Sequence, residues 1–194
     1  MALGMKIDAM TAIGWAWAAL ALVWLVGLVS TKRTLRSQSP GTRLFQLLVF
    51  ALGFSLMNRR WFGFGWLGTR AAPDLPWIGM AGLALTIAGC VFAIWARISL
   101  GGNWSGRATV KQDHELVTSG PYALARHPIY TGITLALLGT AMAGGEWRHA
   151  VGLVVILFGL MAKMSQEERL MMQTFPVAYP LYRRRVKALI PGVL

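Results

Sequence analysis

Apolar residues occur in five long runs along the chain, separated by polar stretches. The runs cover residues 12–29, 44–57, 77–96, 129–144 and 150–164. A helix that crosses a bilayer needs about 20 mostly apolar residues, with a range of about 17–25. The first and third runs meet this length, and the other three require flanking residues, tilting or local thinning of the bilayer. The pattern predicts an all-α, polytopic membrane protein with about five transmembrane helices.

The composition agrees with a membrane location. Hydrophobic residues make up 56% of the chain and charged residues 13%, whereas ordinary globular proteins have about 25% charged residues. The formal net charge is +12, and the basic residues lie mostly beside the apolar runs, which favours anionic lipid headgroups over nucleic acid as the partner. The single Cys90 excludes an internal disulfide and a multi-cysteine metal site.

Lysine and arginine are distributed unevenly between the two sets of loops. Of the 19 basic residues, 14 fall within residues 30–43, 97–128 and 163–194. Because basic residues are enriched on the cytoplasmic side, we expect an external N-terminus and a cytoplasmic C-terminus, in a membrane that the composition suggests is a bacterial inner membrane. The first run is long and lacks a small-residue cleavage site, so we expect a retained span rather than a signal peptide.

Polar residues suited to chemistry concentrate after Arg97. We therefore expect a single membrane domain in which residues 1–96 form a transmembrane scaffold and residues 97–194 a catalytic half. In GPYALARHPIYTG, residues 120–132, Pro128 suits the first turn of a helix, and His127 is held away from helical geometry because it precedes proline. Two interpretations stay open here: a ligand site, or an interfacial Arg126 beside a helix-capping His127.

A second polar cluster lies at the end of the last apolar run. Lys163 and Glu167 are four residues apart and share one face of a helix. An ionisable pair near the membrane boundary more often faces the bundle interior than lipid, although an ordinary surface salt bridge fits the spacing equally. The three histidines and the dispersed acids show no metal-binding spacing, so we expect no metal site.

The C-terminal tail predicts an amphipathic helix over residues 176–190. Tyr179, Tyr182, Val186 and Leu189 recur at intervals of three and four residues, and Arg183–Arg185 lie beside them. Such a helix is typical of an interfacial segment on anionic lipid.

The motifs LGGNWS, HELVTSGPYALARHPIYTG and EERL, followed by YRRRV, resemble those of the isoprenylcysteine carboxyl methyltransferase family in their order. The resemblance covers about residues 99–191. It implies a cytosolic S-adenosylmethionine pocket formed by the last two spans and their flanking segments. It also implies methyl transfer to a lipophilic acceptor, foremost the carboxylate of a prenylated cysteine.

The resemblance also assigns candidate residues. It implies that Arg126 and Lys163 contact the substrate anion, although the family has arginine at the position of Lys163. Phe175-Pro176 also departs from the family, whose members commonly carry Phe-Gly followed by acids. The cofactor-binding set that it implies is His114, Glu115, Leu116, Val117, Tyr122, His127, Pro128, Ile129, Tyr130 and Glu167.

Four other functions remain open. A phospholipid or amine N-methyltransferase would need a base near the methyl group, because an amine acceptor must lose a proton. A thiol S-methyltransferase, a sterol-reductase-like protein using NADPH, and a non-catalytic membrane scaffold are the other three. The sequence leaves the acceptor and the oligomeric state open.

Overall fold

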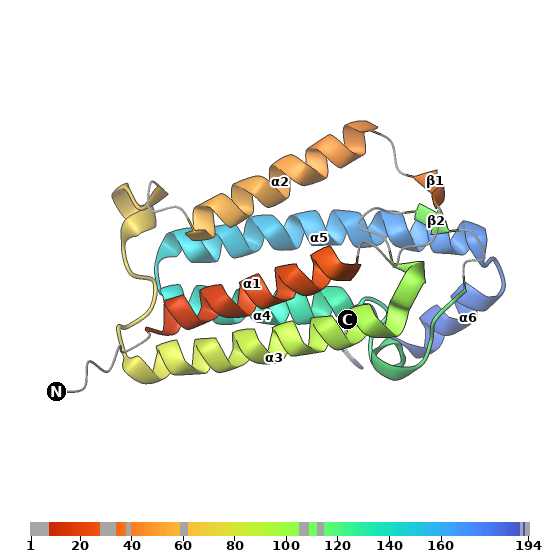
Figure 1. Ribbon diagram of the computed structural model, residues 1–194. Coiled ribbons are helices and arrows are strands. Elements are labelled where there is room, and N and C mark those ends of the chain that lie inside the picture. Colours follow the sequence, from red (N-terminus) through yellow and green to blue (C-terminus); the bar gives the residue numbers. More distant parts are fainter. Residues whose placement is uncertain are drawn as a thin grey trace.

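The protein is an elongated helical bundle (Figure 1). The structure, a computed structural model, describes residues 8–27, 34–37, 40–58, 62–104, 109–111, 115–190 and 192. The α-helices in these residues are α1 (Ala9–Gly27), α2 (Pro40–Asn58), α3 (Pro76–Leu100), α4 (Pro128–Gly144), α5 (Trp147–Thr174) and α6 (Ala178–Arg185). One end of the bundle carries α6, and we call it the α6 end. The other end carries residues 62–75 and 144–149, and we call it the opposite end.

The predicted class of fold is confirmed. Within the described part of the chain, α1, α2, α3 and α5 are long and apolar enough to cross a membrane, and α4 is a shorter apolar helix. Their outward side chains are apolar yet exposed, for example Leu22 at 61%, Leu48 at 61% and Val154 at 64%. Helices that are apolar on all faces are typical of membrane spans. The chain is therefore an integral membrane protein.

Glycines bring α3 and α4 into close contact. A Cβ atom on Gly89 would lie 2.5 Å from the carbonyl oxygen of Gly132, and one on Gly132 would lie 2.6 Å from that of Gly89. Seven residues along each helix, a Cβ on Gly82 would lie 2.5 Å from the carbonyl oxygen of Gly139. Helices in lipid associate largely through such small-residue contacts. This packing holds α4, which begins next to His127, close against α3.

Helix α5 continues well past the apolar run that predicts it. The run ends at residue 164, whereas the helix ends at Thr174. Residues 165–174 include Gln, Glu, Arg, Leu and Met and contain no glycine or proline, so they favour a helix even without an apolar face. Glu167 and Glu168 consequently lie on a long helix that also packs against α2, as Figure 1 shows.

The structure adds a short sheet that the sequence pattern did not predict. Strand β1 (Thr34–Ser37) pairs with β2 (Thr109–Lys111) in antiparallel orientation, with Arg36 opposite Val110. The sheet lies at the α6 end (Figure 1). It joins two segments that are far apart in sequence, the one after α1 and the one after α3.

The predicted C-terminal helix is shorter than expected. Residues 176–190 were expected to be helical, but α6 covers only Ala178–Arg185, and Val186 is extended with φ −117° and ψ 132°. The carbonyl groups of Lys187 and Ala188 instead accept hydrogen bonds from the backbone N–H groups of Arg126 and His127. Tertiary pairing of the backbone therefore replaces the last helical turns. We call residues 186–190 the C-terminal strap.

Candidate functional site

The candidate site begins at the N-terminus of α4. His127 is the residue before the helix, with φ −121° and ψ 58°, and Pro128 occupies its first turn, as the proline spacing predicts. Both residues are buried. The short 3₁₀ helix η4 (Gly120–Ala123) precedes them and carries the buried Tyr122. The segment thus places Arg126 and His127 beside the C-terminal half of α5.

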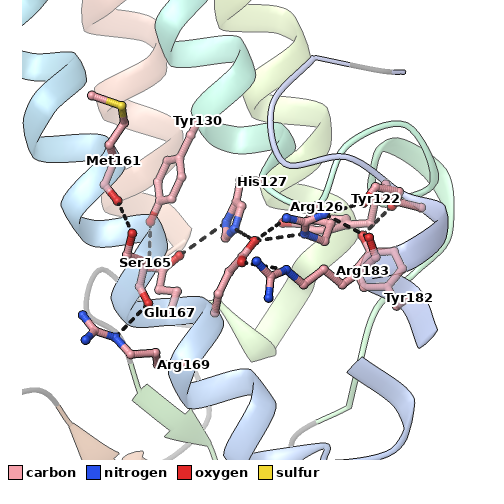
Figure 2. A network of polar contacts seen from close by, with 12 residues as sticks. Tyr122, Arg126, His127, Tyr130, Met161, Ser165, Glu167, Arg169, Tyr182 and Arg183 are labelled. Carbon is pink, nitrogen blue, oxygen red and sulfur yellow. Dashed lines mark hydrogen bonds and ion pairs between the residues drawn. The ribbon is translucent and has the colours of Figure 1, made fainter. Parts of the chain in front are cut away.

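Glu168 of α5 is the centre of an ion-pair cluster at the α6 end. Its Oε1 accepts hydrogen bonds from Arg126 Nε at 2.9 Å and Arg126 Nη2 at 2.6 Å. His127 Nε2 lies 3.3 Å from the same oxygen, and Arg183 Nε lies 3.4 Å from Oε2. The side chains of Arg126 and Glu168 are only 8% and 16% exposed. Figure 2 shows the side chains of Arg126, His127 and Arg183 directed toward one another.

Arg126 also donates hydrogen bonds to backbone carbonyl groups, and its own backbone takes part in such bonds. Its Nη1 donates to the carbonyl oxygens of Val186 and, at 3.3 Å, Arg183. The backbone N–H groups of Arg126 and His127 donate to Lys187 and Ala188 at 2.8 and 2.9 Å. The guanidinium therefore joins α5, α6 and the C-terminal strap around the start of α4.

Glu167, next in the chain to Glu168, makes a separate set of contacts. Its Oε1 accepts a hydrogen bond from the Tyr130 hydroxyl at 2.7 Å and one from Lys163 Nζ at 3.0 Å. Its Oε2 lies 3.7 Å from His127 Nδ1. The Lys163 amine lies 5.6 Å from the centre of the Tyr130 ring, within the range of a cation–π contact. The side chain of Lys163 is 9% exposed, so this pair is not an ordinary surface salt bridge.

An aromatic and apolar cluster adjoins the acids. Trp104, Tyr122 and Ile129 are buried together with Ala96, and Val117 and Tyr130 pack against them. His127 stacks on Tyr130, with the rings 5.6 Å apart and 11° from parallel. Flat rings beside a carboxylate are suited to a ligand that has both an aromatic ring and hydroxyl groups.

Tyr182 of α6 is hydrogen-bonded to the segment that precedes α4. Its hydroxyl donates to the carbonyl oxygen of Tyr122 at 2.6 Å. Burial raises the pKa of Tyr182 to about 12, against a smaller lowering by Arg126. The phenol therefore stays neutral and remains a hydrogen-bond donor at physiological pH.

The structure brings together most of the residues that the sequence singled out. Glu115 is exposed and Leu116 is half-buried. His114 lies outside the described residues. The residues brought together are Arg126, Lys163, Val117, Tyr122, His127, Pro128, Ile129, Tyr130 and Glu167.

Three residues of the cluster were not singled out by sequence. Glu168 entered the predictions only as part of the EERL motif, and Tyr182 and Arg183 were assigned to the tail. The spacing of Tyr182 after Tyr179 indicated an amphipathic helix on the lipid surface, but it did not indicate that the tyrosines pack against the site. Consecutive residues on a helix point about 100° apart, so Glu167 and Glu168 have largely different partners and share only His127.

Comparison with known proteins finds similarity to one protein family. Residues 82–173 match the model of the isoprenylcysteine carboxyl methyltransferase family. The match contains both arms of the site, the segment before α4 and the end of α5. This region of the chain is therefore similar to that family of methyltransferases, in agreement with the resemblance of the sequence motifs.

Individual relatives carry two kinds of name. The cobalt-zinc-cadmium resistance protein CzcN of Cupriavidus metallidurans is 33% identical over 128 residues, which are 65% of this chain and 53% of that protein. Protein-S-isoprenylcysteine O-methyltransferase B of Arabidopsis thaliana is 29% identical over 120 residues, 60% of this chain and 61% of that protein. The corresponding Schizosaccharomyces pombe methyltransferase is 35% identical over 81 residues, 41% of this chain and 34% of that protein. The matched region thus spans about half of the first two relatives, and less of the third. In the described residues, no group of three or more His, Cys, Asp or Glu side chains is arranged to hold a metal ion.

Proposed function

We propose that the chain is a membrane-embedded methyltransferase that uses S-adenosylmethionine and methylates a lipophilic acceptor, with the carboxylate of a prenylated cysteine as the first choice. The observation that carries the proposal is the meeting of the ARHPIY segment with Lys163, Glu167 and Glu168 at one end of the bundle. Both arms fall within the region that matches the methyltransferase family. In this proposal residues 97–194 are the catalytic half, and residues 1–96 are the scaffold.

The residues at the site fit the chemistry of this cofactor. S-adenosylmethionine has an adenine ring, ribose hydroxyls, an ammonium, a carboxylate and a sulfonium. Glu167 Oε1 is already hydrogen-bonded by Tyr130 and Lys163, so Oε2 is the oxygen we assign to a ribose hydroxyl or the ammonium. Val117, Tyr122 and Ile129 would line the adenine, with His114, Glu115, Leu116, His127 and Pro128 beside them. When bound, the cofactor would supply an electrophilic methyl group on its sulfonium.

The chain itself would bind and align the acceptor. A carboxylate acceptor is ionised at neutral pH, so it needs no general base. Lys163 would hold that anion through its ammonium. Arg126 would act on the acceptor too, and its bonds to Glu168 and to the C-terminal strap would set its direction. Good alignment of reacting groups supplies about 7–11 kcal/mol of the barrier reduction in favourable cases.

The arrangement of helices suggests how the two substrates arrive. The apolar spans would admit a lipid tail laterally from the bilayer, and the polar cofactor would enter from water at the α6 end. Because the basic residues concentrate at this end, we propose that it faces the cytoplasm and the N-terminus faces outside. A bacterial inner membrane would be the location.

Calorimetry on the detergent-solubilised chain tests the cofactor. We expect S-adenosylmethionine to bind and NADPH not to bind. Glu167→Gln should weaken S-adenosylmethionine binding about 10- to 100-fold, because hydrogen bonds to a charged group are worth about 1.5–3 kcal/mol. Asp74→Asn, a substitution of an exposed acid at the opposite end, is the matched control and should bind as the wild type does. Binding of NADPH alone would exclude the methyltransferase.

Labelled S-adenosylmethionine then identifies the acceptor. Prenylated cysteine analogues, phosphatidylethanolamine and thiols are supplied separately, and methyl incorporation is measured. Incorporation into the first alone supports the carboxylate proposal. Incorporation only into an amine or a thiol assigns the chain to N- or S-methylation. Cofactor binding without any incorporation would contradict the choice of acceptors.

A further inference from the structure

The outer face of α6 differs from the face that covers the site. On the inner face Tyr179 and Tyr182 are buried. On the opposite face the side chains are exposed, with Val177 at 74% and Leu181 at 51%. Residues three and four apart share a helix face, so one surface combines apolar and basic side chains. We call it the outer α6 face, and it consists of Val177, Leu181, Arg184 and Arg185.

The C-terminal strap connects this surface to the first turn of α4. The Thr131 hydroxyl, in the first turn of α4, donates to the carbonyl oxygen of Leu189 at 2.8 Å. The next residue, Ile190, is 51% exposed. Because α4 is an apolar helix of the bundle, its first turn marks the start of the apolar zone. The strap therefore runs from α6 back to the edge of the lipid.

The charge of this region is of one sign. No Asp or Glu follows Glu168 in the sequence, whereas Arg169, Arg183–Arg185 and Lys187 do. Arg183 is directed inward to Glu168, and Figure 2 shows it beside Tyr182 on the site side of the helix. Arg184 and Arg185 are exposed. A second copy of the chain docking here would bring two basic clusters together, which disfavours self-association.

We propose that the outer α6 face binds the anionic headgroups of the membrane in which the protein is embedded. Arg184 and Arg185 contact lipid phosphates, and Val177, Leu181 and Ile190 enter the boundary of the acyl chains. Surface helices with basic and apolar residues bind anionic membranes in this way. The patch is small, but the spans tether it to the bilayer, so docking is intramolecular and needs little intrinsic affinity.

Docking has a consequence for the site. The same short helix presents Arg184 and Arg185 to lipid and Tyr182 and Arg183 to the protein. Lipid contact on the outer face thus holds α6 in the position where Tyr182 reaches Tyr122 and Arg183 reaches Glu168. This surface does not depend on which methyl acceptor the protein uses, or on the methyltransferase proposal.

Fluorescence quenching in nanodiscs tests the surface. An environment-sensitive fluorophore is attached through Leu181→Cys, since the native Cys90 is buried. The full chain is reconstituted in phosphatidylcholine with or without phosphatidylglycerol, and doxyl-labelled lipid serves as quencher. We expect quenching to increase with phosphatidylglycerol and to decrease at high salt. Each basic side chain near an anionic surface contributes about fivefold, so Arg184→Gln/Arg185→Gln should shift the docked-to-undocked ratio about 30-fold.

The control removes the same charge at the same end of the bundle. Arg43→Gln/Arg169→Gln changes exposed arginines of α2 and α5 and should leave quenching unchanged. Equal quenching with and without phosphatidylglycerol would overturn the proposal, as would equal effects of the two double variants. A cross-linked dimer through residue 181 would identify a second copy as the occupant and would overturn it too. Each of these measurements reports lipid contact, so its result does not depend on whether the protein transfers methyl groups.

Discussion

The two ends of the bundle both contain a buried arginine paired with a glutamate, yet they are built differently. At the opposite end, Arg148 Nε donates to Glu146 Oε2 at 2.6 Å, and Arg148 Nη1 donates to the carbonyl oxygens of Leu56 and Met57 at the end of α2. Glu146 and His149 form a capping box at the start of α5. Most of these side-chain contacts join residues two or three apart or satisfy the last carbonyls of a helix.

The α6 end makes its contacts between distant segments. Arg126 and Glu168 are 42 residues apart, and Tyr122 and Tyr182 are 60 apart. Two adjacent carboxylates each collect polar partners from other segments instead of capping a helix. The contacts at the opposite end therefore stabilise the turn between α4 and α5. The contacts at the α6 end instead gather ionisable side chains in one place, which is typical of a functional site.

The largest expected effect comes from removing either arginine. Arg126→Ala leaves Glu168 without its closest cation, and breaking a buried pair costs about 3–5 kcal/mol. Arg148→Ala should cost less through its ion pair, because Glu146 is 30% exposed, but it also removes the donor to the carbonyl oxygens of Leu56 and Met57. Both should lower the thermal unfolding temperature in detergent, with Arg126→Ala also weakening S-adenosylmethionine binding. Thermal unfolding with and without cofactor measures both quantities. If Arg148→Ala weakens cofactor binding equally, the two ends do not have the separate roles assigned above.

A smaller effect distinguishes two tyrosines at the α6 end. Tyr130→Phe removes a hydrogen bond to the Glu167 carboxylate, and such bonds are worth about 1.5–3 kcal/mol. Tyr182→Phe removes one to a neutral carbonyl, worth about 0.5–1.5 kcal/mol. Thermal unfolding should rank Tyr130→Phe as the more destabilising, and calorimetry should find weaker cofactor binding in it. The reverse ranking would contradict the central position of Glu167.

The smallest effect concerns acid stability at the opposite end. The hydrogen bond from Arg148 lowers the pKa of Glu146 below 4.5, although burial opposes this. The pair therefore stabilises the protein fully above the unfolded pKa, and this contribution is lost as the pH falls through the lower folded pKa. Glu146→Gln should reduce stability at neutral pH by about 1 kcal/mol or less and flatten its decline in acid. Unfolding at several pH values checks this, and an unchanged acid slope would count against the pairing.

Local signals predicted the elements better than the contacts between them. The apolar runs indicated five helices, Pro128 indicated where α4 begins, and the spacing of Lys163 and Glu167 indicated a shared face. The length of α5 was underestimated because an apolar criterion stops at the first charges, while helix propensity continues to Thr174. The tail was overestimated as a helix, since pairing of Lys187 and Ala188 with the start of α4 depends on residues about 60 positions away.

The amino-acid sequence by itself determined that the chain is a helical membrane protein, and its motifs resemble those of a methyltransferase family. Both conclusions depend only on residues that are close together in the sequence. An apolar run of sufficient length is stable in lipid wherever it occurs, and a motif can be recognised without knowing which residues pack against it. Only the tertiary structure decided that Glu168 is shared by Arg126, His127 and Arg183, and that α6 has one face on the site and one free. Those contacts depend on how α4, α5 and α6 pack together, which residues far apart in the sequence decide jointly.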